Sequence, residues 1–180
     1  MFIPRYDMIE PHIKVVASVD GGAICNDNGI LSVSGSTLSG NSAGNDGGAI
    51  YNGVAPGLHP FLSINSTVTV TNSVLSGNSA GVDGGGIFNA VDPGSGYPGM
   101  LTVSASTFSN NSAGDRGGGI DNAGVATVSG SSFTGNSASS GGGIYNQSGA
   151  LLTLSGSTFS ANTADAVFGP WTDGGGNTFS

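Results

Sequence analysis

The sequence has little charge, and basic residues are especially scarce. It contains three of them, Arg5, Lys14 and Arg116, against 11 acidic residues, and its formal net charge is −8. Proteins that bind nucleic acids neutralise phosphates with Lys and Arg, so this composition argues against a nucleic-acid partner. The same scarcity argues against binding of an acidic polysaccharide by charge.

Cysteine and long apolar runs are also scarce. Cys25 is the single cysteine, which excludes a disulfide within the chain. No run of about 18 apolar residues occurs, so we expect no transmembrane segment. Asp7, Glu10 and Lys14 interrupt any apolar run near the start, and no signal peptide is visible in this chain. We still expect an extracellular or cell-surface location, because the composition is that of a surface protein.

Glycine, in contrast, is abundant, with 34 residues in 180. These glycines show no three-residue period, which excludes collagen. In a helix each would cost about 1 kcal/mol relative to alanine. A disordered low-complexity chain is disfavoured, because 37% of the residues are hydrophobic and they recur in register.

A unit of about 24 to 37 residues recurs five times, with a partial sixth copy. Each copy has a Gly-rich segment, an isoleucine, and an asparagine two positions after the isoleucine. An apolar pair five residues apart follows, and a second asparagine comes three residues later. The two asparagine columns are Asn26, Asn52, Asn89, Asn122 and Asn146, and then Asn41, Asn78, Asn111, Asn136 and Asn162.

The spacing predicts an all-β solenoid. Thr127-Val128-Ser129 alternates polar and apolar residues, which is the period of a half-buried strand. Strands this short are stable only when successive repeats stack in parallel and bury their apolar columns. We expect the asparagines to form internal ladders, because their amides bond to turn backbone and to the equivalent asparagine of the next coil.

The expected organisation is one elongated domain. We predict an N-terminal cap over 1–19, β-helix repeats over 20–166, and a partial coil or cap over 167–180. Insertions are expected near 53–67 and near 90–100. Both follow the same Ile-x-Asn element, so we expect them to emerge from the same corner on adjacent coils.

Two of the repeat motifs resemble a known family. Gly21-Gly22-Ala23-Ile24 and Gly47-Gly48-Ala49-Ile50 resemble the Gly-Gly-Ala-Ile motif of chlamydial polymorphic outer-membrane proteins. Phe108-x-x-Asn111, Phe133-x-x-Asn136 and Phe159-x-x-Asn162 resemble their Phe-x-x-Asn motif. The resemblance implies a right-handed parallel β-helix, as in many bacterial surface proteins, and an adhesin-like secreted role.

Candidate binding residues fall into two groups. The insertions carry His59, Phe61, Asp92 and Tyr97, and insertions on one face of a solenoid often form its binding face. A second group is an outward column of aromatic residues for partner or sugar stacking, interrupted by Asp121. Its members are Tyr51, Phe88 and Tyr145.

Metal binding is the first alternative for the acidic residues that precede the glycines. Asp20, Asp46, Asp83 and Asp173 stand in that position, and stacked carboxylates can bind Ca²⁺. A role in capping turns is favoured over this, because no nine-residue calcium-binding period exists. We expect no metal and no cofactor.

Two other functions remain as alternatives. A polysaccharide lyase or hydrolase would need an acid and a base, for which His59 and Asp92 are the available pair. Rows of Ser and Thr on the outer strand faces, such as Thr102 and Thr127, resemble those of ice-binding solenoids. We favour a non-enzymatic structural or adhesive surface module that contacts a protein or glycan surface and can assemble with itself.

Overall fold

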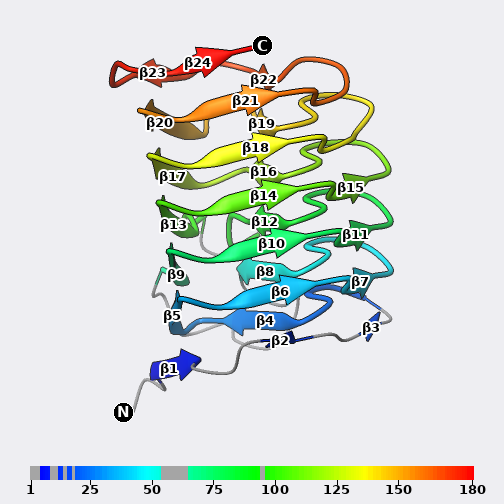
Figure 1. Ribbon diagram of the computed structural model, residues 1–180. Helices are drawn as coiled ribbons and strands as arrows, with labels where there is room; N and C mark the ends of the chain where they lie inside the picture. The colour runs from blue at the N-terminus through cyan, green and yellow to red at the C-terminus, as the bar shows by residue number, and fades with distance from the viewer. Residues whose placement is uncertain (1–4, 9–11, 14–15, 18, 54–64, 94–95) are drawn as a thin grey trace.

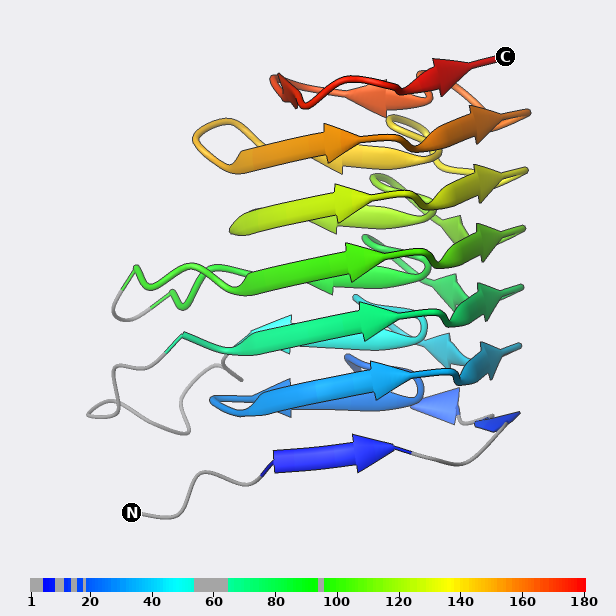
Figure 2. The same ribbon diagram turned by 60° about the vertical axis from the view of Figure 1, so that its left-hand side comes forward.

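Short β-strands wind into a stack of coils in the computed structural model (Figure 1). The structure describes residues 5–8, 12–13, 16–17, 19–53, 65–93 and 96–180. These ranges contain strands, turns and loops but no helix. The strands lie across the stack axis, and each coil sits directly on the one before it, as Figure 2 shows from the side.

Four sheets run along the stack. The first complete coils contribute strands to them in the order D, A, B, C, and the later coils contribute only to D, A and B. Sheet A contains β1 (Arg5–Met8), β5 (Ile30–Ser34), β9 (Thr67–Thr71), β13 (Met100–Ser104), β17 (Val125–Ser129), β20 (Leu151–Ser155) and β23 (Thr172–Asp173). Sheet B contains β2 (His12–Ile13), β6 (Thr37–Ser39), β10 (Val74–Ser76), β14 (Thr107–Ser109), β18 (Ser132–Thr134), β21 (Thr158–Ser160) and β24 (Thr178–Phe179). Sheet C contains β3 (Val16–Ala17), β7 (Ser42–Ala43), β11 (Ser79–Ala80) and β15 (Ser112–Ala113). Sheet D contains β4 (Ile24–Asp27), β8 (Ile50–Gly53), β12 (Ile87–Asn89), β16 (Ile120–Asn122), β19 (Ile144–Asn146) and β22 (Val167–Phe168).

Every pairing between these named strands is parallel and joins equivalent residues of successive coils. Ile120 pairs with Ile144, for example, and Val103 pairs with Val128. This register is what a repeat of fixed pattern requires, because only an in-register stack keeps each apolar column inside. The predicted right-handed parallel β-helix of about five coils and a partial sixth is therefore confirmed, with strands stacked over about six coils.

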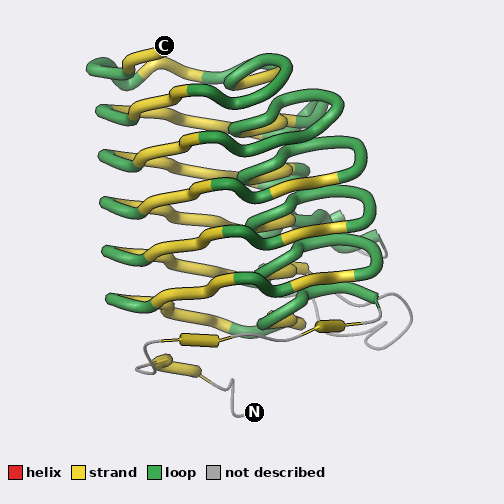
Figure 3. Tube along the Cα trace, turned by 45° about the vertical axis from the view of Figure 1, so that its right-hand side comes forward, coloured by secondary structure: helices red, strands yellow, loops and turns green. Residues whose placement is uncertain are grey.

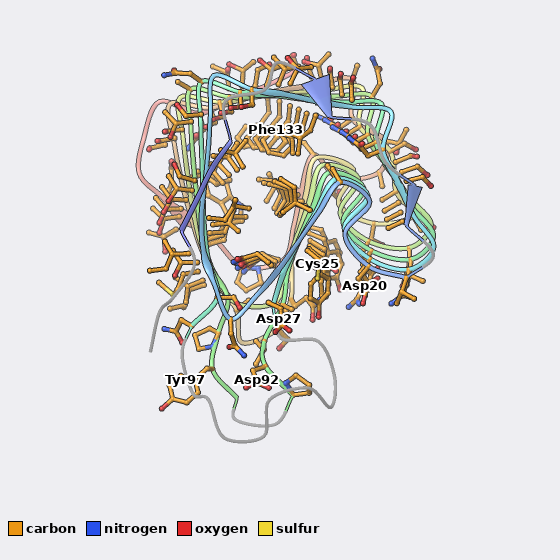
Figure 4. The ribbon with its side chains drawn as sticks, turned by 90° about the horizontal axis from the view of Figure 1, so that it is seen from below. Asp20, Cys25, Asp27, Asp92, Tyr97 and Phe133 are labelled. Atoms are coloured by element: carbon orange, nitrogen blue, oxygen red, sulfur yellow. The ribbon has the colours of Figure 1, made fainter. Side chains whose placement is uncertain are left out.

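The core is a set of continuous apolar columns inside the coil. Phe108, Phe133 and Phe159 are fully buried, and neighbouring rings stack with centroids 4.7 and 4.9 Å apart. Figure 4, which looks along the stack, shows Phe133 within this column. Burial of each such side chain stabilises the fold by about 1.5–3 kcal/mol, so the repeated columns supply most of the hydrophobic stabilisation.

Buried asparagines form two hydrogen-bonded ladders along the stack. In the first, each side-chain amide of Asn26, Asn52, Asn89 and Asn122 donates to the Oδ1 of the next asparagine at 2.7–2.8 Å, ending on Asn146. In the second, the amides of Asn41, Asn78, Asn111 and Asn136 do the same at 2.8–3.0 Å, ending on Asn162. These ladders lie at two corners where the chain must turn inside the protein, so they supply partners for backbone groups that no strand satisfies.

A third ladder, made of serines, lies at the bend between sheets A and B. The Oγ of each serine accepts a hydrogen bond from the backbone N–H of its equivalent in the previous coil. Its members are Ser36, Ser73, Ser106, Ser131 and Ser157, and Asn177 takes the next place. This serine ladder was not predicted from the sequence.

The corners depend on backbone conformations that residues other than glycine rarely adopt. The residue before each ladder serine has a positive φ, including 57° at Gly35, 49° at Asn72 and 47° at Ala105. Figure 3 shows these turns aligned one above another. The Gly-rich corner before sheet D is tighter still, since a Cβ placed on Gly119 would lie 2.5 Å from the Gly143 carbonyl oxygen. Glycine is therefore needed there for close approach of successive coils.

Both ends of the chain add strands to the same stack. Strands β1, β2 and β3 pair in parallel with β5, β6 and β7, so the segment expected to cap the first coil continues three of its sheets. At the other end, β22, β23 and β24 pair with β19, β20 and β21. The ring of Phe179 stacks on Phe159 at 5.1 Å, and Trp171 lies 6.0 Å from Phe179.

Candidate functional site

The outer face of sheet D carries one side chain per coil, at the second position of each strand. In register, this sheet D column is Cys25, Tyr51, Phe88, Asp121, Tyr145 and Phe168. Figure 4 places Cys25 and Asp20 on one flank of the coil, beside the outward bulge of chain that connects sheets C and D. The column and the bulge together bring most of the described titratable groups to this flank.

The aromatic members of the column are less open than the sequence suggested. Tyr51 is only 7% exposed, and Phe88 and Tyr145 are half-buried. Tyr51 stacks on Phe88 with centroids 5.6 Å apart, and Tyr145 stacks on Phe168 at 4.9 Å. The rings stack in two pairs, with Asp121 between them, and the expected use of this column for stacking on a partner or a sugar stays a prediction.

Three of the acidic residues that precede the glycines, Asp20, Asp46 and Asp83, form a capping column, whereas the fourth, Asp173, lies in β23 of sheet A. A carboxylate oxygen of Asp20 accepts a hydrogen bond from the backbone N–H of Asp46 at 3.1 Å. Asp46 accepts in the same way from the backbone of Asp83, and Asp83 from that of Arg116, each at 3.1 Å. Each of these three carboxylates therefore satisfies a backbone N–H group in the turn of the following coil.

Arg116 takes the place of an aspartate in the fourth coil of this column. Its guanidinium donates from two nitrogens to the carboxylate of Asp83, with Nε 3.1 Å from Oδ1. The same side chain lies 3.6 Å from Asp121 and 3.8 Å from Asp115, measured between Nε and the nearest oxygen. Its guanidinium carbon also lies 5.3 Å from the centre of the Tyr145 ring. Arg116 is therefore a shared counter-charge that partly offsets three carboxylates, and its hydrogen bond to Asp83 raises the pKa of its own guanidinium.

Asp121 is the least accessible charged group described. Its side chain is fully buried, and both carboxylate oxygens accept hydrogen bonds from the Gln147 amide at 3.1 Å. Burial raises the pKa of this carboxyl from 3.8 to about 7, although Gln147 and Arg116 act in the opposite direction. This cluster of Asp83, Arg116, Asp121 and Gln147 was not found from the sequence. The available signal was Arg116 standing where three other coils have aspartate.

Two other groups on this flank have shifted pKa values. Burial raises the pKa of Asp46 to about 6, with the Asp83 and Asp20 charges adding to the effect. Burial and the Asp27 carboxylate also raise the pKa of the Cys25 thiol. A thiol must ionise to act as a nucleophile, so the surroundings of Cys25 suppress reactivity rather than promote it.

The insertion after β12 forms a small hairpin at the corner between sheets D and A. The Asp92 N–H donates to the Tyr97 carbonyl at 2.8 Å, and Val91 forms an antiparallel bridge with Pro98. Tyr97 is 44% exposed, and Figure 4 shows both Asp92 and Tyr97 on the chain that projects from this corner. His59 and Phe61 lie outside the described residues, so the His59–Asp92 pair of the enzymatic alternative is not tested.

The described part of the chain contains no group of three or more His, Cys, Asp or Glu side chains placed to hold a metal ion. None of its segments forms a helix long and apolar enough to cross a membrane. The chemistry of this flank is hydrogen bonding and charge compensation. Its carboxylates accept hydrogen bonds from backbone N–H groups, from the Gln147 amide and from the Arg116 guanidinium.

Comparison with known proteins found a family model that matches three segments of the repeats. A family model described as the Chlamydia polymorphic membrane protein repeat matches residues 35–53, 105–123 and 130–147. Each matched segment begins at the bend between sheets A and B and runs through one asparagine of each ladder. No curated protein and no solved structure matched the chain. The chain is thus a right-handed parallel β-helix protein whose repeats resemble those of the chlamydial polymorphic membrane proteins.

Proposed function

We propose that this chain is a non-enzymatic module of a cell surface or outer membrane, with a structural or adhesive role and the ability to associate with itself. Repeats of the matched kind belong to membrane proteins by the family's own description, which supports a surface or outer-membrane location. The observation that carries the proposal is that the three matched segments lie in one continuous stack, together with an unmatched coil between the first and the second. The first asparagine ladder, which includes Asn52, Asn122 and Asn146 of the matched segments, joins every coil from β4 to β19.

A stack of this kind suits the display of a binding surface better than the catalytic turnover of a substrate. Its walls present Ser and Thr in fixed rows, and its corner presents the hairpin that carries Tyr97. An exposed aromatic residue on a braced loop is the type of side chain that anchors protein and glycan contacts. The adhesive contact is therefore assigned to the insertion corner, with Tyr97 as an anchor, while the walls support it.

Adhesion can be tested with the whole chain displayed on beads. Beads should bind cultured epithelial cells or immobilised matrix glycans, and Tyr97→Ser should reduce the number bound severalfold. Val82→Ser is the matched control, because Val82 is a 39% exposed apolar residue outside this corner. Unchanged binding by the Tyr97 variant would remove the corner from the proposal.

An enzyme that acts on polysaccharides would give a different result. Release of unsaturated or reducing ends from uronic-acid polymers, lost in Asp92→Asn, would replace the non-enzymatic proposal by a lyase or hydrolase. Absence of binding to every cell and glycan surface, at bead densities where a known adhesin binds, would overturn the adhesive role.

A further inference from the structure

The outer face of sheet A carries an apolar stripe along the stack. The stripe occupies the first position of each strand from β5 to β20 and consists of the apolar residues Ile30, Met100, Val125 and Leu151, with Thr67 interrupting it at β9. Leu151 is 65% exposed and Ile30 is 45% exposed, while the residues between them are half-buried. Large apolar side chains this open, aligned in one row of a flat sheet, are typical of a contact surface.

The middle column of the same strands is made of hydroxyl side chains. In register it contains Ser32, Thr69, Thr102, Thr127 and Thr153. None of the five strands β5, β9, β13, β17 and β20 contains a charged residue. We call the outer surface of these five strands face A.

The charge distribution points to a second copy of the chain as the occupant of face A. Each copy has a net charge of −8, so two copies repel unless their acidic groups stay apart. The acidic column Asp20, Asp46 and Asp83 lies at the start of the turns leading to sheet D, away from sheet A. Contact through face A therefore joins two acidic molecules through an uncharged surface.

We infer that face A is a self-association surface on which two copies pack with their stacks antiparallel. A two-fold axis along the central strand β13 then places each stripe against the other copy's stripe. Leu151 of one copy meets Ile30 of the other, and Met100 meets its own equivalent. The same axis brings β1 of one copy next to β23 of the other copy, whereas parallel stacks would place equivalent ends together.

The available area predicts a weak dimer. Five-residue strands span about 16 Å, and five strands spaced about 4.8 Å apart span about 24 Å with their margins. Face A thus offers about 400 Å² per copy, below the roughly 800 Å² per partner of a standard stable interface. We expect a reversible dimer that forms at micromolar to millimolar concentrations. This inference rests on the self-association in the proposed function and not on its adhesive role.

Sedimentation equilibrium of the whole chain tests the surface. The mean mass should rise from 17.4 kDa towards twice that value as concentration increases. Leu151→Glu should weaken the dimer at least tenfold, whereas Val74→Glu should not, because Val74 is an exposed valine on sheet B. A strict monomer up to millimolar concentration, or equal effects of the two variants, would overturn the inference.

The antiparallel arrangement makes a separate prediction. The double variant Ile30→Lys and Leu151→Glu creates two complementary pairs across the proposed axis, so it should dimerise more strongly than either single variant. In a Cys25→Ser background, Thr102→Cys near the axis should form a covalent dimer on oxidation, and Thr134→Cys on sheet B should not. This packing is excluded if the double variant dimerises no more strongly than the single variants and if Thr102→Cys forms no more covalent dimer than Thr134→Cys. Cell-binding assays on the same variants report on adhesion separately.

Discussion

Asp121 is fully buried, and the positive charge that faces it is the guanidinium of Arg116, whose Nε lies 3.6 Å from the Asp121 Oδ2. Asp83 lies on the other side of Arg116 and holds it from the preceding coil. A carboxylate in this position is costly to bury, and only its hydrogen bonds and this cation offset the cost. The fourth coil therefore contains a polar cluster in a stack that otherwise depends on apolar columns and neutral ladders.

Replacing Arg116 should lower the stability of the protein, because Asp121 would remain buried without its cation. Arg116→Gln leaves Asp83 and Asp121 without their shared counter-charge, so we expect the free energy of unfolding at pH 8 to fall by about 3 kcal/mol. Urea denaturation followed by circular dichroism measures it. Asp165→Asn is the control, because Asp165 is exposed, and equal losses in the two variants would show that Arg116 has no special role.

Stability should increase on mild acidification. Burial raises the pKa of Asp121 to about 7 and that of Asp46 to about 6, both above the usual 3.8. Between about pH 7 and pH 4 the folded state therefore binds more protons than the unfolded state, and the free energy of unfolding rises as pH falls. Thermal melts should give a higher Tm at pH 5 than at pH 8.

The pH effect has a specific control. Asp121→Asn removes the most strongly shifted group while keeping its shape, so the difference in Tm between pH 5 and pH 8 should shrink. A Tm that falls steadily between pH 8 and pH 5 in the unaltered protein would contradict the assigned pKa shifts.

The sequence predicted the stack well because the same physical demand recurs in every coil. An inward position such as Val128 and an internal amide such as Asn122 each have equivalents in neighbouring repeats, and periodicity makes them visible. Arg116 and Asp121 break their columns, so periodicity alone gave no reason to pair them. Strand alternation predicted the side of the sheet that Tyr51 faces, but it could not predict that Tyr51 would be buried there and stacked on Phe88.

The asparagine ladders should contribute strongly to stability. Asn111 is fully buried, donates to Leu75 and Asn136, and accepts from Asn78. Asn111→Ala leaves the hydrogen-bonding groups of Leu75, Asn136 and Asn78 without this partner, so we expect a loss of about 1–3 kcal/mol in the free energy of unfolding. The adjacent Asn110 is exposed with φ of 54°, and Asn110→Gly should be neutral or slightly stabilising. Similar losses at both positions would show that the ladder is not the source of the effect.

The bends between sheets A and B offer a stabilising substitution. Ala105 has φ of 47°, where other coils have glycine at the same bend, such as Gly130 with φ of 54°. A left-handed backbone costs a non-glycine residue about 1 kcal/mol, so Ala105→Gly should raise the free energy of unfolding by up to that amount. Gly130→Ala should lower it by a similar amount, since no atom lies within 4 Å of the added methyl group and strain alone decides the result. Chemical denaturation of the two variants measures both changes, and a loss of stability in Ala105→Gly would show that backbone strain at this bend is not the controlling term.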